Sequence, residues 1–274
     1  MVILTGFADE ISHDLEEQLN VLESEGIRHL ELRGVWGKNV LDLTEEDAAR
    51  VKARLDERGF RVSSIGSPLG KIKITDDFAP HYEKARYAVK LAQFFEAPFI
   101  RTFSFYIPRG EADTYRDEVM NRMRAITSLG EEAGVIFVHE NESHIYGDIG
   151  ERCQDLLDTI QSSSLKAAFD PANFVQCHVK PMSEAYPLLK DHIAYIHIKD
   201  AIMGSGKVVP AGHGDGEVSE LIQQLIATGY EGFLSLEPHL HAKDEYEGLS
   251  RAELFIVAVR ALKKLLKEHD VVWS

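Results

Sequence analysis

The sequence is poor in cysteine and has no long apolar run. Cys153 and Cys177 are the two cysteines among 274 residues, and their spacing fits no CxxC motif and no disulfide framework. No apolar stretch approaches the ~20 residues that a membrane-spanning helix requires. The first residues carry no basic segment and reach an acid at Asp9. We therefore expect a protein of a reducing compartment, the cytoplasm, with no membrane partner.

Positive charge is also scarce. Lys and Arg number 30 against 45 Asp and Glu, which gives a formal net charge of −15 at pH 7. Such a chain repels phosphate backbones, and no basic stripe with interleaved aromatic residues offsets this repulsion. Nucleic acid is therefore not an expected partner. The chain likewise lacks a linker rich in Pro, Gly or Ser, so we expect residues 1–274 to form one domain.

Short apolar runs alternate with amphipathic segments along the chain. Four helix ends share one pattern, a glycine followed by an apolar strand start, at Gly26, Gly59, Gly134 and Gly229. Glycine suits such an end because a helix commonly stops at a left-handed residue. Ser12, Thr44 and Ser219 are plausible helix caps. The expected strands are 2–7, 28–32, 61–65, 98–103, 135–139, 165–169, 193–198 and 232–236, and the clearest helices are 14–25, 45–58, 79–95, 114–133 and 251–267.

Eight such repeats of strand and helix predict an α/β fold, a (β/α)8 TIM barrel of a single domain. Its chemistry belongs at the carboxyl ends of the strands, which meet at one face. Four late strands end there on a potential metal ligand, in the segments VIFVHE, LKAAFD, IAYIHIKD and GFLSLE. A single acid at a strand end is more often a helix cap or a solvated loop residue. Four in successive strands favour a metal site made of Glu140, Asp170, His197 and Glu237.

Three carboxylates and one imidazole suit Mn²⁺, Mg²⁺, Co²⁺ or Zn²⁺ and argue against a thiolate-bound metal or haem. The segments HEN (139–141), FDPAN (169–173), HIKD (197–200) and SLEPHL (235–240) resemble the sugar-phosphate isomerase/epimerase group of the xylose-isomerase-like TIM barrels. ELRGVWGKNVLDL (31–43), SPLGK (67–71) and IRTFSFY (100–106) extend the resemblance over nearly the whole chain. It implies the same four ligands around one divalent ion, with Mn²⁺ favoured.

The resemblance also implies a reaction. The ion would act as a Lewis acid for an enediolate formed from a carbohydrate substrate, and a base must take the proton from the adjacent carbon. Glu140 and Glu237 enter from opposite sides of the substrate, so one can remove the proton and the other can return it to the opposite face. We therefore predict a metal-dependent isomerase or epimerase of a sugar, keto-sugar or sugar phosphate, with these two glutamates as catalytic residues.

The chain departs from the related ketose 3-epimerases around the substrate. Tyr146, Asn173 and Met203 stand where those enzymes usually carry Glu, His and Arg, which puts a free ketohexose in doubt. Lys71 and Arg101 would hold a phosphate or carboxylate, or else pair with neighbouring acids. The segment 204–216 is either a flexible connection or a lid over the site. The predicted substrate contacts are Glu31, Lys71, Arg101, His144, Asn173, Lys199 and His213.

Other functions fit the same motifs. A dehydratase of an inosose-like keto-polyol would use the same metal site and expel a β-hydroxyl instead of reprotonating the carbon. A metallonuclease of the endonuclease IV type shares the fold, but it needs a histidine-rich zinc cluster and a basic face. A sugar-binding module without activity is a further alternative. The expected partner is a small carbohydrate, and the exposed helices of a barrel are compatible with a homo-oligomer.

Overall fold

Eight parallel strands form one sheet that is nearly closed into a barrel in this computed structural model, which describes residues 1–243 and 246–274. The strands follow the order β1-β12-β9-β8-β7-β6-β5-β2. A parallel bridge between Phe7 and Glu31 joins the two ends of this order, next to β1 and β2. The strands are β1 (Ile3–Gly6), β2 (His29–Leu32), β5 (Arg61–Leu69), β6 (Phe99–Thr102), β7 (Ile136–Glu140), β8 (Leu165–Phe169), β9 (Ile193–Ile198) and β12 (Phe233–Leu236).

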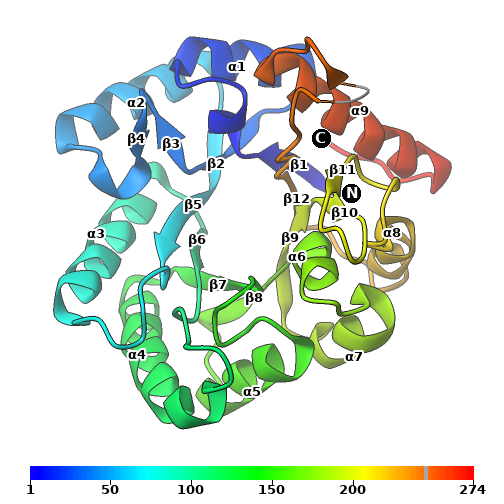
Figure 1. Cartoon of the computed structure of the whole chain (residues 1–274). Helices are drawn as coiled ribbons and strands as arrows, with labels where there is room; N and C mark the ends of the chain where they lie inside the picture. Colours follow the sequence, from blue (N-terminus) through cyan, green and yellow to red (C-terminus); the bar gives the residue numbers. More distant parts are fainter. Residues whose placement is uncertain (244–245) are drawn as a thin grey trace.

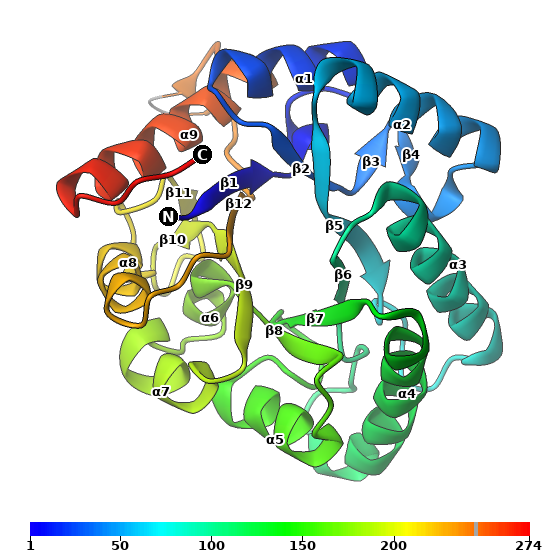
Figure 2. The same cartoon turned by 180° about the vertical axis from the view of Figure 1, so that it is seen from behind.

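Helices form the outer ring (Figures 1 and 2). None of those in the described residues is long and apolar enough to cross a membrane. They are α1 (Leu15–Ser24), α2 (Glu45–Arg58), α3 (Ala79–Phe95), α4 (Ala112–Ala133), α5 (Gly150–Ile160), α6 (Pro171–Gln176), α7 (Tyr186–Leu189), α8 (Val218–Ala227) and α9 (Arg251–Glu268). Shorter elements are η1 (Ala8–Glu10), η2 (Val40–Asp42), η3 (Pro181–Ala185) and two small hairpins, β3 (Gly34–Val35) with β4 (Lys38–Asn39) and β10 (Asp200–Ala201) with β11 (Val208–Val209).

The alternation of strand and helix predicted from the sequence is confirmed. All eight strands lie where they were expected, although β5 continues to Leu69 and β7 includes Glu140. The four glycines after α1, α2, α4 and α8 have φ between 69° and 71°, as a left-handed helix end requires. The Thr44 cap is confirmed too, with its hydroxyl accepting from the Asp47 amide.

Two predicted helix caps were wrong. Asp14, and not Ser12, caps α1, because the Asp14 carboxylate accepts from the Glu17 amide while the Ser12 hydroxyl accepts from the amide of Asp14 itself. Ser219 lies inside α8, which begins after Glu217. Both serines are one or two residues from the real boundary, so local composition placed the helix but did not place its first residue.

A polar floor lies inside the barrel beneath the carboxyl ends of the strands. The Tyr195 hydroxyl is 2.9 Å from Ser63 Oγ, which is 2.7 Å from Thr5 Oγ1. Ser235 Oγ donates to Glu31 Oε2 at 2.7 Å. These side chains are buried, and they pair with one another as buried polar groups must. These buried polar groups therefore support, from below, the charged side chains at the carboxyl ends of the strands.

The segment after β9 is folded around the carboxylate of Asp200. Oδ1 accepts from the amides of Ala201 and Gly216 at 2.8 Å, and Oδ2 accepts from those of Gly212 and Gly214 at 2.9 Å. A Cβ on Gly214 would lie 2.4 Å from Asp200 Oδ1, so only glycine allows this approach. Within the segment 204–216, residues 212–216 are therefore an ordered loop and not a loose connection.

We expect Asp200→Asn to lower the free energy of unfolding by about 2 kcal/mol or more, since the new amide must face two backbone N–H donors with a donor of its own. Denaturant unfolding would measure the change. Asp191→Asn, at an exposed position, is the matched control and should change stability by no more than ~0.5 kcal/mol. Equal stability of the two variants would contradict this account of the loop.

Candidate metal and active site

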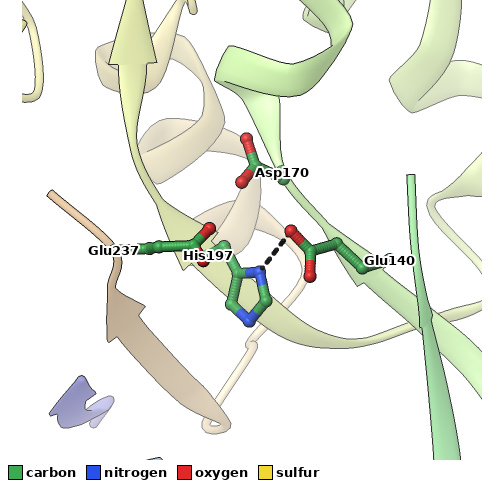
Figure 3. A group of neighbouring side chains, drawn as sticks. All are labelled: Glu140, Asp170, His197 and Glu237. Atoms are coloured by element: carbon green, nitrogen blue, oxygen red, sulfur yellow. Dashed lines mark ion pairs between the residues drawn. The ribbon is translucent and has the colours of Figure 1, made fainter. Parts of the chain in front are cut away.

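The structure brings together the four side chains predicted as metal ligands (Figure 3). Glu140 is the last residue of β7, Asp170 follows β8, His197 is near the end of β9 and Glu237 follows β12. One ligand atom of each lies within 4.8 Å of the others. All four residues are buried, with exposed fractions of 3% or less. Residues far apart in the sequence therefore form one cluster at the mouth of the barrel.

Two asparagines hold the acidic ligands in place. Asn141 spans β7 and β8, because its side-chain amide donates to the Asp170 carbonyl and accepts from the Asp170 amide, both at 2.9 Å. Asp170 caps α6 by accepting from the Asn173 amide at 2.8 Å. The Asn173 side chain in turn donates to Glu140 Oε1 at 3.1 Å. The sequence HEN followed by FDPAN thus fixes one carboxylate relative to the other.

His197 lies between two carboxylates. Its Nε2 is 3.2 Å from Glu31 Oε2, and its Nδ1 is 3.2 Å from Glu140 Oε1. Burial alone would lower the pKa of His197, but Glu140 and Glu31 outweigh it and raise the pKa well above the usual value. If the Nε2–H group of His197 donates to Glu31, a metal cation could take the place of the proton on Nδ1. This carboxylate–histidine arrangement typically orients a metal-binding imidazole.

Three cationic side chains neutralise the acidic cluster. Lys199 Nζ lies 2.9 Å from Asp170 Oδ2 and 2.8 Å from Glu237 Oε2. Arg101 Nη1 is 3.1 Å from Glu140 Oε2 and 3.4 Å from Glu237 Oε1. Arg33 Nη1 reaches Glu237 Oε1 at 3.1 Å. Lys199 and Arg101 are buried with the acids, and Arg33 is half-buried.

These cations act on the carboxylates unequally. Burial raises the pKa of Asp170 to about 6 although Lys199 opposes it. Burial would also raise the pKa of Glu140, but His197 and Arg101 hold it to about 2. For Glu237, Lys199 and the other nearby cations overcome burial and keep its pKa well below the usual value. The two glutamates are therefore ionised at neutral pH, as ligands and bases must be.

The donor atoms fit a divalent cation. Asp170 Oδ2 and His197 Nδ1 are buried in the centre of the cluster. Lys199 Nζ lies 2.9 Å from the first atom and Glu140 Oε1 lies 3.2 Å from the second, but neither contact has hydrogen-bond geometry. Each atom therefore retains a lone pair that a cation could bind. Three carboxylates with one imidazole are the ligands that Mn²⁺, Mg²⁺, Co²⁺ and Zn²⁺ accept. Glu140, Asp170, His197 and Glu237 are thus able to hold one ion.

A second group of potential ligands adjoins the first. Glu10, Glu237 and His239 also offer atoms within 4.8 Å of one another. Arg33 already binds this group, because its Nη2 is 3.2 Å from Glu10 Oε1 and its Nη1 contacts Glu237. A guanidinium therefore supplies the positive charge here, and we assign no ion to this group.

The residues predicted to contact substrate lie at different distances from the cluster. Glu31, Arg101, Asn173 and Lys199 contact the metal-ligand side chains directly. Lys71 pairs with Glu142 at 3.1 Å, one of the alternatives open from the sequence. His144 and His213 are exposed, and neither makes an ion pair or side-chain hydrogen bond with any described residue.

Sequence reasoning missed Arg33 and Asn141. Arg33 directly follows β2, so its place at a strand end was visible, but its partner Glu237 is 204 residues away. Asn141 was visible in HEN only as a neighbour of Glu140. Tyr146, at the position of an epimerase glutamate, donates its hydroxyl to Asp155 at 2.5 Å, and among the described residues no hydrogen bond or ion pair joins it to the four candidate ligands.

The chain belongs to the xylose isomerase-like TIM barrel family, whose model matches residues 19–271. A comparison with curated proteins found no match. The fold and the family that the motifs predicted are therefore confirmed. Its structural neighbours include epimerases, a probable dehydratase and a protein with a bound zinc atom. The buried cluster described above could bind a metal.

Solved structures share the fold at low sequence identity. The probable 3-DHS dehydratase AsbF of Bacillus anthracis is 20% identical, with 96% of this chain and 99% of that chain covered and a TM-score of 0.75. A D-tagatose 3-epimerase-like protein is 15% identical, with 98% of each chain covered and a TM-score of 0.78. The IolI protein with a bound zinc atom is 13% identical, with 97% and 99% covered and a TM-score of 0.77.

Glu31→Gln should weaken metal binding about 10–100-fold although Glu31 is not a ligand, because it orients His197 and increases the basicity of the imidazole. Calorimetric titration with Mn²⁺ would measure the affinity, and the rise in melting temperature on adding Mn²⁺ should shrink in parallel. Glu142→Gln, which alters an acid paired with Lys71 outside the cluster, is the control. Unchanged affinity in Glu31→Gln would refute the role given to Glu31.

Proposed function

We propose that the protein is a divalent-metal-dependent isomerase or epimerase of a sugar or keto-sugar. The observation that carries the proposal is the placement of Glu140 and Glu237 on opposite sides of the cluster, with Asp170 and His197 between them (Figure 3). When bound, the ion supplies Lewis-acid stabilisation for negative charge on adjacent oxygens of the substrate. The carboxylate and imidazole donors suit Mn²⁺, Mg²⁺, Co²⁺ or Zn²⁺, and the family resemblance favours Mn²⁺.

The two glutamates transfer the proton. One carboxylate takes the proton from the carbon next to the substrate carbonyl, and the other returns a proton to the opposite face or to the neighbouring carbon. Arg101 contacts both carboxylates and so lowers their basicity in the free protein. A substrate oxygen that draws Arg101 away would make both carboxylates stronger bases. Arg101 therefore links substrate binding to proton transfer in this proposal.

The charges around the cluster favour a substrate without phosphate. The cluster and its neighbours contain six carboxylates and three Lys or Arg side chains, so with His197 and His239 neutral a divalent ion would leave a net charge of about −1. A phosphate would add further negative charge to a buried site. Lys71, a basic residue near the mouth, is paired with Glu142. The six carboxylates belong to Asp9, Glu10, Glu31, Glu140, Asp170 and Glu237, and the three cations are Arg33, Arg101 and Lys199.

Solvent-deuterium exchange tests the two-base mechanism. In D₂O with Mn²⁺, the wild-type protein should place deuterium on one carbon of a ketose or keto-glycoside, detected by NMR. Glu140→Gln and Glu237→Gln should each lose more than the ~10²–10⁴-fold that acid–base catalysis contributes, because metal affinity falls as well. In each variant the residual exchange should favour one epimer. The epimer favoured by Glu140→Gln should differ from the one favoured by Glu237→Gln.

Asp170→Asn is the comparison for that experiment, since it weakens a metal ligand without removing a base. It should depress exchange from both epimers together. If metal-saturated Glu140→Gln and Glu237→Gln also lose exchange equally from both epimers, the two-base mechanism is wrong. A mechanism with a single base would then be favoured.

Lys199 makes a lyase the second candidate. Its ammonium group is buried beside Glu237, where a proton donor for a departing hydroxyl would stand. In this reaction a glutamate takes the proton next to the carbonyl and the C–O bond of the β-hydroxyl breaks. Lys199 protonates that oxygen, so water leaves and a C=C bond conjugated to the carbonyl remains. The dehydratase among the structural neighbours has the same fold.

Lys199→Met separates the two candidates, because it removes the donor and retains most of the side-chain volume. If the protein is a lyase, the wild type should form an ultraviolet-absorbing enone, and Lys199→Met should exchange deuterium but eliminate at least ~10²-fold more slowly. If it is an epimerase, no enone should form with either protein. Lys71→Met is the control, because it removes a lysine near the mouth of the barrel that pairs with Glu142.

A further inference from the structure

A large cavity lies beside the cluster at the mouth of the barrel. Its volume is about 840 Å³. Most of its lining comes from residues 206–208 of the β10–β11 hairpin, residues 238–243 after β12, and the beginning of α9. Glu10, Gln176, Tyr246 and Leu249 complete it. Cavities of roughly 300–1,000 Å³ accommodate ligands of drug size. The space is therefore much larger than a single sugar ring requires.

The cavity adjoins the proposed active site at His239 and Glu10. Both residues line the cavity, and His239 Nε2 is 3.1 Å from Glu10 Oε1 and 3.6 Å from Glu237 Oε1. Pro238, the residue after Glu237, lines it as well. His239 has a φ of 45°, a left-handed conformation that turns the chain directly after the metal ligand. A substrate held at Glu237 would thus have the cavity immediately beside it.

Most of the exposed lining is apolar, although Lys207, Lys243 and Arg251 also border the cavity. Val208, Leu240 and Leu249 are half-buried, while Leu254 and Phe255 are buried at its base. A sugar offers hydroxyl groups, which match the acids and cations around Glu237 and do not match this surface. An apolar group would remove water from the lining and gain binding energy in proportion to the area covered. The two regions therefore differ in the chemistry that they can recognise.

We propose that the substrate is a sugar that carries a second, largely apolar group, with the sugar at Glu140 and Glu237 and the apolar group in this cavity. The inference rests on the proposed function for the place of the sugar. It adds the substrate class, which is a glycoside or similar conjugate and not a free monosaccharide. His239 stands at the boundary and would contact the link between the two parts.

Binding of matched glycosides tests this proposal without requiring turnover. The probes are phenyl and methyl glycosides of glucose, galactose and mannose, titrated by calorimetry into the Mn²⁺-loaded protein. The phenyl member of at least one pair should bind about tenfold more tightly or better, because the ring buries apolar area that the methyl group lacks. Equal affinity within every pair, or no binding of any phenyl glycoside, overturns the proposal.

Variants that fill the cavity provide a second test of the proposal. Val208→Trp and Leu249→Trp place a large ring in the lining from two different segments, so one suffices if the other misfolds. Each should reduce the affinity for the phenyl glycoside to that for the methyl glycoside. Ile226→Trp, on an exposed position of α8, should leave the preference intact. A phenyl preference that survives in both filled variants would place the apolar group elsewhere and overturn the proposal.

The proposed function can fail separately. Deuterium exchange into unconjugated ketoses without any phenyl preference would support the isomerase or epimerase and overturn the conjugate. A phenyl preference abolished by Val208→Trp, with no exchange in any carbonyl compound, would support the cavity and refute the proposed reaction.

Discussion

The structure depends on the burial of three carboxylates and a histidine at one point. Moving such groups out of water is costly, and like charges within 4.8 Å of one another repel. Lys199 and Arg101 offset this cost in the free protein by lying between the acids. The raised pKa of Asp170 shows that the compensation is incomplete. A divalent ion would complete it, and Asp170 Oδ2 and His197 Nδ1, which make no well-formed hydrogen bond with a described residue, would be among its ligands.

Direct side-chain contacts within the barrel hold the four buried side chains in place. Each ligand is at or next to the end of a parallel strand, where the sheet fixes the backbone. Asn141 and Asn173 then tie Glu140 to Asp170, and Glu31 holds His197 from the polar floor. Every one of these contacts joins neighbouring strands or crosses the barrel interior. The position of the cluster is therefore a property of the closed sheet and not of any single loop.

The sequence predicted the parts of this arrangement that have a local pattern. Apolar runs and glycine-terminated helices located the strands, and acids at strand ends located Glu140, Asp170 and Glu237. The partners of these acids could not be predicted in the same way. Arg33 meets Glu237 across 204 residues, and its position after β2 does not indicate which acid it will meet. Glu31 was predicted to contact substrate, but its contact with His197 appears only when β2 and β9 face each other across the barrel.

The same cations have a further consequence for the ion itself. Because Lys199 and Arg101 already pair with the ligands, an incoming ion must displace favourable contacts, so its net affinity is lower than four donors alone would give. If Glu140, Asp170 and Glu237 held an ion, the Lys199 ammonium and the Arg101 guanidinium would have N–H donors free for other acceptors. Sugar hydroxyl and carbonyl oxygens are suitable acceptors for these donors. Binding of the ion would thus convert two side chains that stabilise the free protein into two that recognise substrate, and it would do so without a large movement of the barrel.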